Sequence, residues 1–243
     1  MESYRLIPEK YRFLNNSVLK CIALITMIID HVASVLLHSD QTVLIDVFGL
    51  QLTLYALMRG IGRIAFPIYV FLLVEGFHHT HNRKAYGTRL LVFALISEIP
   101  WDLEHSGSFF FWKQNVFFTL FLGYLGLCLI ERLKKEDNRF KNTLLLLTVF
   151  LISVFLRADY GFAGFGFILL FGLFRNYPVY RAIAGTCFLS ETWQAGFAFI
   201  PIAFYNGKRG FVKNRFLKIL FYVLYPLHML VLFFIKKYVF GGY

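Results

Sequence analysis

The sequence has little cysteine, little acid and none of the common nucleotide or hydrolase motifs. Its three cysteines lie in apolar stretches, without the paired spacing of a disulfide framework or a metal site: Cys21, Cys128 and Cys187. Gly-x-Ser-x-Gly, Walker and Rossmann patterns are absent, so nucleophile-elbow and P-loop chemistries find no support. We also find no internal repeat, low-complexity segment or soluble domain.

Hydrophobic residues dominate what is present. Of the 243 residues, 58% are hydrophobic and 16% are charged, and the mean hydropathy is +0.61. This composition predicts an integral membrane protein in an all-α class, a single polytopic helix-bundle domain over 1–243. The 30 phenylalanines and 14 tyrosines suit lipid contact, the commoner role, and also a tunnel for a chain-like substrate.

The apolar stretches predict about eight to ten membrane-spanning helices, with nine favoured and eight as the alternative. The third stretch is short and ends at Pro100, which predicts a tilted or partly re-entrant helix. Region 179–204 fits one long span or two short ones broken near 191–196, and loop charge favours two. The predicted spans are 18–37, 61–77, 90–101, 116–130, 143–156, 162–174, 179–204 and 216–235.

The formal charge of +11 comes from 25 basic and 14 acidic residues, with the basic ones in short connections between apolar stretches. They do not follow one amphipathic face, so a nucleic-acid partner is not expected. The positive-inside rule instead places these connections and the amino terminus in the cytoplasm, and the carboxyl terminus outside. We expect a multi-pass protein of the bacterial cell membrane. The first span lacks a cleavage site, so it is not expected to be a removed signal peptide.

Asp30 and His31 lie inside the first apolar stretch, where a charge costs about 2.5–3.5 kcal/mol on insertion scales. Imidazole suits acid–base chemistry near neutral pH, which makes His31 the first catalytic candidate. Adjacent helical residues point about 100° apart, so Asp30 and His31 should contact different partners. A hydrogen-bonded structural histidine is the alternative.

Arg59 and Arg63 are four residues apart, and so lie on one helical face if the helix begins early enough. Arginine binds carboxylates or phosphates through a bidentate fork, and Asp30 and Glu75 are the expected counter-ions. A structural ion pair and a substrate contact are equally compatible with this pattern. Gly60 and Gly62 permit close backbone approach, while Pro67 would kink the helix.

Glu75 and His78 belong to a group of ionisable residues where the second span meets the cytoplasm. A single Glu-x-x-His occurs in dimetal bundles, but those sites need a second copy that this chain lacks, so no metal is predicted. The alternatives are an interfacial cap and local positive charge that attracts an anionic cofactor such as a nucleotide phosphate.

Polar residues also mark the outer half of the predicted bundle. Glu98 lies beside Pro100, and Asn115 begins a span. His228 follows Tyr225 and Pro226 in the last span, so two histidines in two spans allow a site between helices, although the sequence does not show that they meet.

Six blocks in order resemble the TraX family of polytopic bacterial membrane proteins, named for a conjugative factor associated with amino-terminal acetylation of pilin. The resemblance covers nearly the whole chain. The blocks are LKCIALITMIIDH at 19–31, RGIGRIAFPIYVFLLVEGFHHT at 59–80, YGTRLLVFALISEIPWDL at 86–103, NVFFTLFLGYLGL at 115–127, ADYGFAGFGFILL at 158–170 and FYVLYPLHMLVL at 221–232.

This family is similar in turn to the transmembrane acyltransferase superfamily, which uses a histidine in an early span. Lys20 and His31 resemble its basic-residue-x10-His pattern, with lysine in place of the commoner arginine. The resemblance implies transfer of an acetyl or longer acyl group from acyl-CoA in the cytoplasm to an amine or hydroxyl at the outer face. The acceptor would be a peptide amino terminus, a glycan or a lipid.

The resulting hypothesis gives each candidate a role. His31 would act as the general base or transient acyl carrier, Arg63 would stabilise the oxyanion, and Asp30 would pair with a base or hold the helix. Two further sets complete the site: Lys20, Arg59, Glu75, His78 and Arg89 toward acyl-CoA, and Glu98, Asn115, Tyr225 and His228 toward the acceptor. The rival hypotheses are a proton-coupled transporter or flippase, and a non-catalytic assembly factor for pilin-like peptides.

Overall fold

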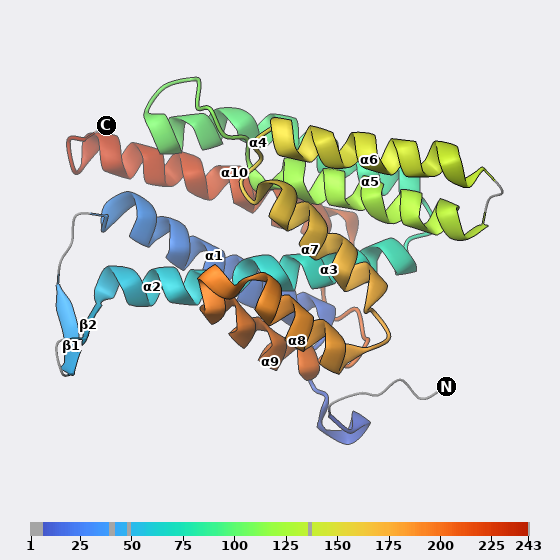
Figure 1. Cartoon of the computed structure of the whole chain (residues 1–243). Helices are drawn as coiled ribbons and strands as arrows, with labels where there is room; N and C mark the ends of the chain where they lie inside the picture. Colours follow the sequence, from blue (N-terminus) through green and yellow to red (C-terminus); the bar gives the residue numbers. More distant parts are fainter. Residues whose placement is uncertain (1–6, 39–41, 48–49, 136–137, 243) are drawn as a thin grey trace.

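A computed structural model describes residues 7–38, 42–47, 50–135 and 138–242, and it is a helical bundle (Figure 1). The predicted all-α class is confirmed. The longer helices are α1 (Asn16–Leu36), α3 (Ala65–His79), α4 (Arg83–Ser106), α5 (Val116–Lys135), α6 (Arg139–Phe155), α7 (Gly161–Leu173) and α10 (Arg215–Tyr238). The shorter elements are η1 (Glu9–Tyr11), β1 (Val43–Val47), β2 (Leu50–Thr53), α2 (Leu54–Gly62), α8 (Pro178–Phe188), η2 (Ser190–Ala198) and α9 (Phe199–Ala203).

Among the described residues, four helical stretches are long and apolar enough to cross a membrane: α1, α2 together with α3, α5 and α10. Helix α7 is apolar but shorter. α3 lies at the centre, packed against α1, α5, α7, α9 and η2, and ten of its fifteen residues are buried. The short segment η1 and the last turn of α10 lie on opposite sides of the bundle (Figure 1).

Asparagine begins four helices at one end of the bundle. Its side chain accepts a hydrogen bond from the backbone N–H three residues later, which satisfies one of the unpaired donors of the first turn. The four caps are Asn15 to Val18 at 3.1 Å, Asn82 to Ala85 at 2.9 Å, Asn138 to Lys141 at 3.1 Å and Asn214 to Leu217 at 2.7 Å.

Helix α4 differs from its predicted form. It covers 24 residues, begins before Leu90 and continues through Pro100 to Ser106, so the predicted short span ending at Pro100 is wrong. Proline removes one backbone donor, and packing of α4 against α5 and α10 holds the helix together across that gap. The extra turn after Pro100 carries Glu104 into the protein interior.

The predicted second span is broken into α2 and α3 at Arg63 and Ile64. The Pro67 ring falls in the first turn of α3, where it would clash with the Arg63 carbonyl in a continuous helix. Just before the break, a Cβ atom on Gly62 would overlap the side chain of Asp30. Glycine therefore lets α1 and α2 approach closely, as the sequence predicts.

Region 179–204 is broken near 191–196, as predicted, but α8 has 11 residues and α9 has five, so neither is long enough to be the short membrane span that was expected. Helices α8 and α9 are joined by the 3-10 segment η2, in which Thr192 has non-helical angles of φ −129° and ψ 57°.

The loop 204–214, between α9 and α10, wraps around the start of α1. The Ser17 hydroxyl donates to the Arg209 carbonyl at 2.8 Å and accepts from the Val212 N–H at 2.8 Å. Gly210 has a φ of +77°, and a Cβ atom there would overlap Asn15 and lie 2.7 Å from the Ser17 hydroxyl. These contacts hold Arg209 over the first turns of α1.

Candidate functional site

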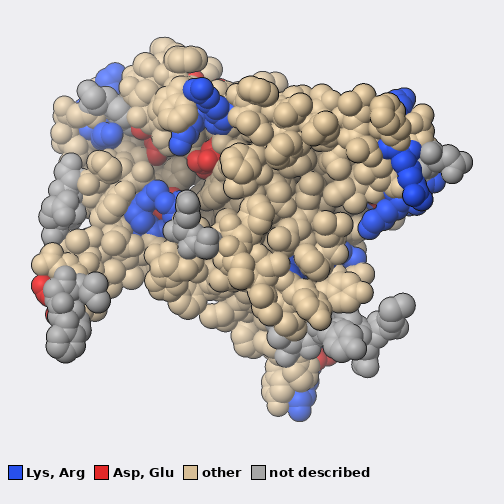
Figure 2. Space-filling view, in the orientation of Figure 1, with Lys and Arg blue, Asp and Glu red and all other residues tan. Residues whose placement is uncertain are grey.

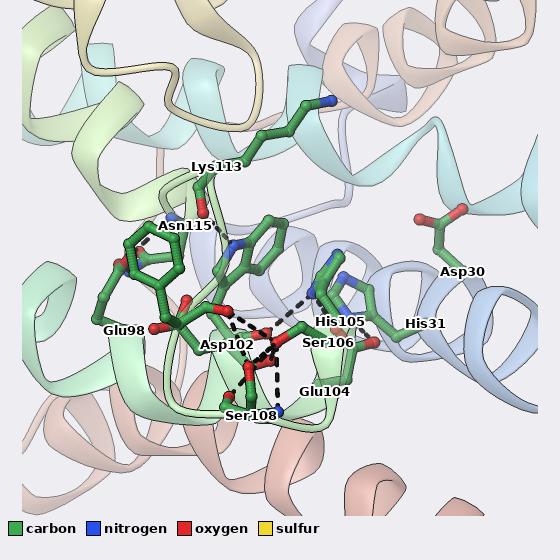
Figure 3. Close-up of polar contacts among 12 residues, drawn as sticks. Asp30, His31, Glu98, Asp102, Glu104, His105, Ser106, Ser108, Lys113 and Asn115 are labelled. Atoms are coloured by element: carbon green, nitrogen blue, oxygen red, sulfur yellow. Dashed lines mark hydrogen bonds and ion pairs between the residues drawn. The ribbon is translucent and has the colours of Figure 1, made fainter. Parts of the chain in front are cut away.

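His31 on α1 faces Glu104 on α4. The His31 Nδ1 atom lies 3.5 Å from Glu104 Oε1, and the exposed fractions of the two side chains are 15% and 2%. His105 Nδ1 contacts the other Glu104 oxygen and lies 3.0 Å from the Trp101 carbonyl. Figure 3 shows both imidazoles converging on the Glu104 carboxylate. A buried carboxylate between two imidazoles can fix the orientation of both rings.

Asp30 points to a different partner, as its position beside His31 predicts. Its Oδ2 atom accepts a hydrogen bond from Arg59 Nη1 at 2.7 Å, and Figure 3 shows it apart from Glu104. The expected pairing of Asp30 with an arginine is thereby confirmed.

A cavity of about 120 Å³, here called the histidine cavity, lies beside these groups. Its polar lining comes mainly from α1, from α2 and the break that follows it, from α4 and from the turn before α7, and includes Asp30, His31, Ser34, Arg59, Arg63, Glu104, His105, Asp159 and Tyr160. Figure 2 shows a hollow where acidic and basic side chains gather on an otherwise largely uncharged face.

His228 on α10 packs against His31. The ring centroids are 4.9 Å apart with an interplanar angle of 69°, so the two predicted histidines meet. His228 Nδ1 lies 3.0 Å from the Leu224 carbonyl. This contact fixes the ring beside His31.

A second cavity of about 490 Å³, here called the basic cavity, lies between the first turns of α1, the end of α3, α4, α5 and α10. Its lining includes four basic side chains: Lys20, Arg89, Arg209 and Lys218. Glu75 is the one carboxylate among the lining residues, and it pairs with Arg175 at 2.9 Å. Burial raises the pKa of Tyr205, in the loop at the cavity wall, to about 12, so its hydroxyl is neutral.

The two cavities share five lining residues, here called the shared wall: Met27, Tyr69, Val116, Leu120 and Tyr225. All five are apolar or aromatic. The side chains of these five residues therefore form the partition between the two cavities.

Comparison with known proteins identifies the family. A sequence profile described as TraX protein matches residues 15–236. The chain belongs to the TraX protein family. It is also 29% identical over 246 aligned positions to a probable fimbrial assembly protein FimC, serogroup H1, of Dichelobacter nodosus, covering 88% of this chain and 92% of that protein. No solved structure matches.

The residues of this TraX family member that were expected to bind acyl-CoA do not all lie in one cavity. Lys20, Glu75 and Arg89 line the basic cavity, whereas Arg59 lines the histidine cavity with Arg63. His78 lines neither cavity. The expectation that Glu75 would neutralise Arg59 or Arg63 is wrong, because its carboxylate contacts Arg175 and His79.

Glu98 and Asn115, expected to contact the acceptor, contact each other instead. Asn115 is fully buried, and its side-chain amide donates to Glu98 and to the Ala94 carbonyl at 2.8 Å. Its Oδ1 atom accepts from the Phe117 N–H at 3.0 Å, which caps α5. Neither residue lines the two cavities, so the pair joins α4 to the start of α5.

Sequence reasoning missed Glu104, His105, Asp159 and Arg209 as site residues. Glu104 follows the Pro100-Trp101-Asp102 segment in which the third span is predicted to end, which would put it at the outer face, and the sequence singles out no role for His105. Asp159 and Arg209 lie in loops, where only the fold shows which helix they approach. Within the described ranges, no group of three or more His, Cys, Asp or Glu side chains is arranged to hold a metal ion.

Proposed function

We propose that this TraX family protein is a membrane-embedded acyltransferase that moves an acyl group from acyl-CoA in the basic cavity to an amine or hydroxyl in the histidine cavity. The observation that carries the proposal is the buried His31–Glu104 pair, in a polar cavity that shares a wall with a larger basic one.

The chemistry of the basic cavity suits the donor. Coenzyme A carries phosphates, which lysine and arginine bind through charge-assisted hydrogen bonds. Lys20, Arg89, Arg209 and Lys218 supply four such groups, against one carboxylate that is already paired. A volume of about 490 Å³ falls in the range of small-molecule sites, and tyrosine and phenylalanine walls accommodate an apolar arm.

In the histidine cavity, His31 is placed to act as a general base. Glu104 beside Nδ1 holds the proton on that nitrogen and leaves Nε2 to accept one from the acceptor. Bound acyl-CoA supplies an activated acyl carbon and a sulfur leaving group. The acceptor nitrogen or oxygen bonds to that carbon, the carbon–sulfur bond breaks, and His31 returns the proton to the departing sulfur.

The arrangement across the membrane follows the charge distribution. We place the basic cavity on the cytoplasmic side with the amino terminus, because the basic loops gather at that end of the bundle. The histidine cavity then lies toward the outer face. Donor and acceptor would meet at the shared wall from opposite sides.

The test measures acetyl-CoA binding and slow hydrolysis by the protein in lipid nanodiscs. We expect saturable binding by the wild type, and in His31→Ala the same binding with hydrolysis lost. His38→Ala is the matched control, because His38 lies just beyond the carboxyl end of α1, is exposed and lines neither cavity. Normal turnover by His31→Ala would reject the role of His31, and absence of acyl-CoA binding and consumption in the wild type would reject the acyltransferase.

A second candidate is a non-catalytic assembly factor for a fimbria-like polypeptide. Its support is the similarity to a probable fimbrial assembly protein. Mass spectrometry of a co-purified polypeptide separates the two: an added acetyl or longer acyl group favours the enzyme, and unchanged mass favours the assembly factor.

A further inference from the structure

Tyr225 on α10 occupies the boundary between the two cavities. Its side chain belongs to the shared wall, and the residue is 4% exposed. The Val116 N–H faces its oxygen, while no described residue accepts the hydroxyl proton. Burying a hydroxyl without an acceptor destabilises a folded protein, so such a group is expected to have a use.

Neighbouring rings hold the phenol in place. Phe117 packs edge-on against it with centroids 5.0 Å apart, and His228 lies 5.7 Å away. His228 in turn packs on His31. The His228 ring therefore lies between Tyr225 and the proposed base His31, and Tyr225 is on the side of the basic cavity, where the donor is proposed to bind.

We propose that the Tyr225 hydroxyl is the hydrogen-bond donor that stabilises the oxyanion formed on the acyl carbonyl oxygen. This inference rests on the proposed acyltransferase function and names a catalytic residue within it. When the acceptor attacks the acyl carbon, the carbonyl π electrons move onto oxygen, and Tyr225 O–H donates a hydrogen bond to that oxygen. As the carbon–sulfur bond breaks, the carbonyl re-forms and Tyr225 keeps its proton.

The location favours Tyr225 over Arg63 for this role. Arg63 lines only the histidine cavity, beside Asp159 and Tyr160. A thioester that extends from the basic cavity reaches the shared wall first, so its carbonyl oxygen meets Tyr225 and the first residue of α5, Val116. The partial positive charge of a helix amino terminus adds to the same stabilisation.

The test is Tyr225→Phe, which removes only the hydroxyl oxygen. We expect the rate of acetyl-CoA hydrolysis to fall about 10²- to 10³-fold, as for loss of one oxyanion donor, with the Kd for acetyl-CoA unchanged. We also expect the thermal unfolding midpoint to fall only slightly, because the hydroxyl donates to no described residue and the substitution removes only its contact with the Val116 N–H. The control is Tyr238→Phe, which deletes an exposed hydroxyl at the end of the same helix.

The possible results distinguish the role of Tyr225 from the proposed acyltransferase function. If the wild type neither binds nor hydrolyses acetyl-CoA, the proposed function and the role of Tyr225 both fail. If the wild type is active and Tyr225→Phe is equally active, only the role of Tyr225 is rejected. Should Tyr225→Phe not fold, 3-fluorotyrosine at position 225 keeps the shape and makes a stronger donor, and an unchanged hydrolysis rate would reject the inference.

Discussion

The Glu104 carboxylate lies between two imidazoles, with Oε1 3.5 Å from His31 Nδ1 and Oε2 in contact with His105 Nδ1. The contact between His31 and Glu104 joins α1 to the last turn of α4, which follows Pro100. If His31 is the base, Glu104 is its positioning residue, because it contacts the imidazole and not the acyl carbon.

Glu104→Gln should lower turnover of acyl-CoA by about 10²- to 10⁴-fold, because the amide no longer fixes the His31 ring with its proton on Nδ1. Donor binding should not change, since Glu104 does not line the basic cavity. Steady-state kinetics should show lower kcat with KM for acyl-CoA nearly constant. Partial recovery is expected for Glu104→Asp, which retains the charge. A fully active Glu104→Gln would argue that His31 is oriented by other groups.

Arg209→Ala should weaken acetyl-CoA binding, because Arg209 is one of four basic groups in the basic cavity. A hydrogen bond to a charged group contributes about 1.5–3 kcal/mol, roughly a 10- to 150-fold change in Kd. Titration at two salt concentrations should also show a smaller salt dependence than in the wild type.

The control for that titration is Lys134→Ala, which removes an equal charge from an exposed site on α5 outside both cavities. Equal weakening by both substitutions would mean that overall charge, and not the basic cavity, attracts the donor.

Gly210→Ala should detach the loop 204–214 from the start of α1. The new methyl group would overlap Asn15 and approach the Ser17 hydroxyl, in addition to the strain of a φ of +77°. Gly207 also has a φ of +77°, but a Cβ atom there would meet nothing within 4 Å. Gly207→Ala therefore measures the effect of backbone strain without a steric overlap. We expect a lower unfolding midpoint for Gly210→Ala than for Gly207→Ala. Indistinguishable variants would contradict the contact of this loop with α1.

Gly62→Ala should destabilise the protein by about 1–3 kcal/mol, because the added methyl group would overlap the Asp30 side chain where α1 meets α2. A Cβ atom at Gly60, two residues before Gly62 on the same helix, would meet only Gln194 at 3.5 Å. Gly60→Ala should be neutral or stabilise by up to about 1 kcal/mol. Unfolding of both variants in one detergent measures the difference, and equal stabilities would mean that the helices separate without cost.

The sequence predicted much of the bundle and less of the site. Long apolar stretches mark helices because the bilayer demands internally satisfied backbones, and Asp30 and His31 stand out because charge is costly there. The contact of Glu104 with His31 could not be found in this way, because it depends on α4 continuing past Pro100. Arg209 depends on a loop that folds back nearly 200 residues along the chain, onto Ser17.

The misplaced residues have a common physical origin. In the sequence, Glu98 lies near the predicted end of one span and Asn115 begins the next, and polar residues at such positions can contact a ligand or cap a helix. Only the observed hydrogen bonds distinguish the two roles. Arg59 was grouped with the phosphate-binding residues by residue type, while the fold pairs it with Asp30.

The shared wall has an electrical consequence. Met27, Tyr69, Val116, Leu120 and Tyr225 offer no charged side chain, so an ion crossing between the cavities would have to shed its water there. A membrane potential drives ions across with a free energy of about 2.3 kcal/mol per elementary charge for each 100 mV. The cost of dehydration at the shared wall opposes that movement. If the two cavities open to opposite sides of the membrane, as proposed, the shared wall keeps ions from crossing between them.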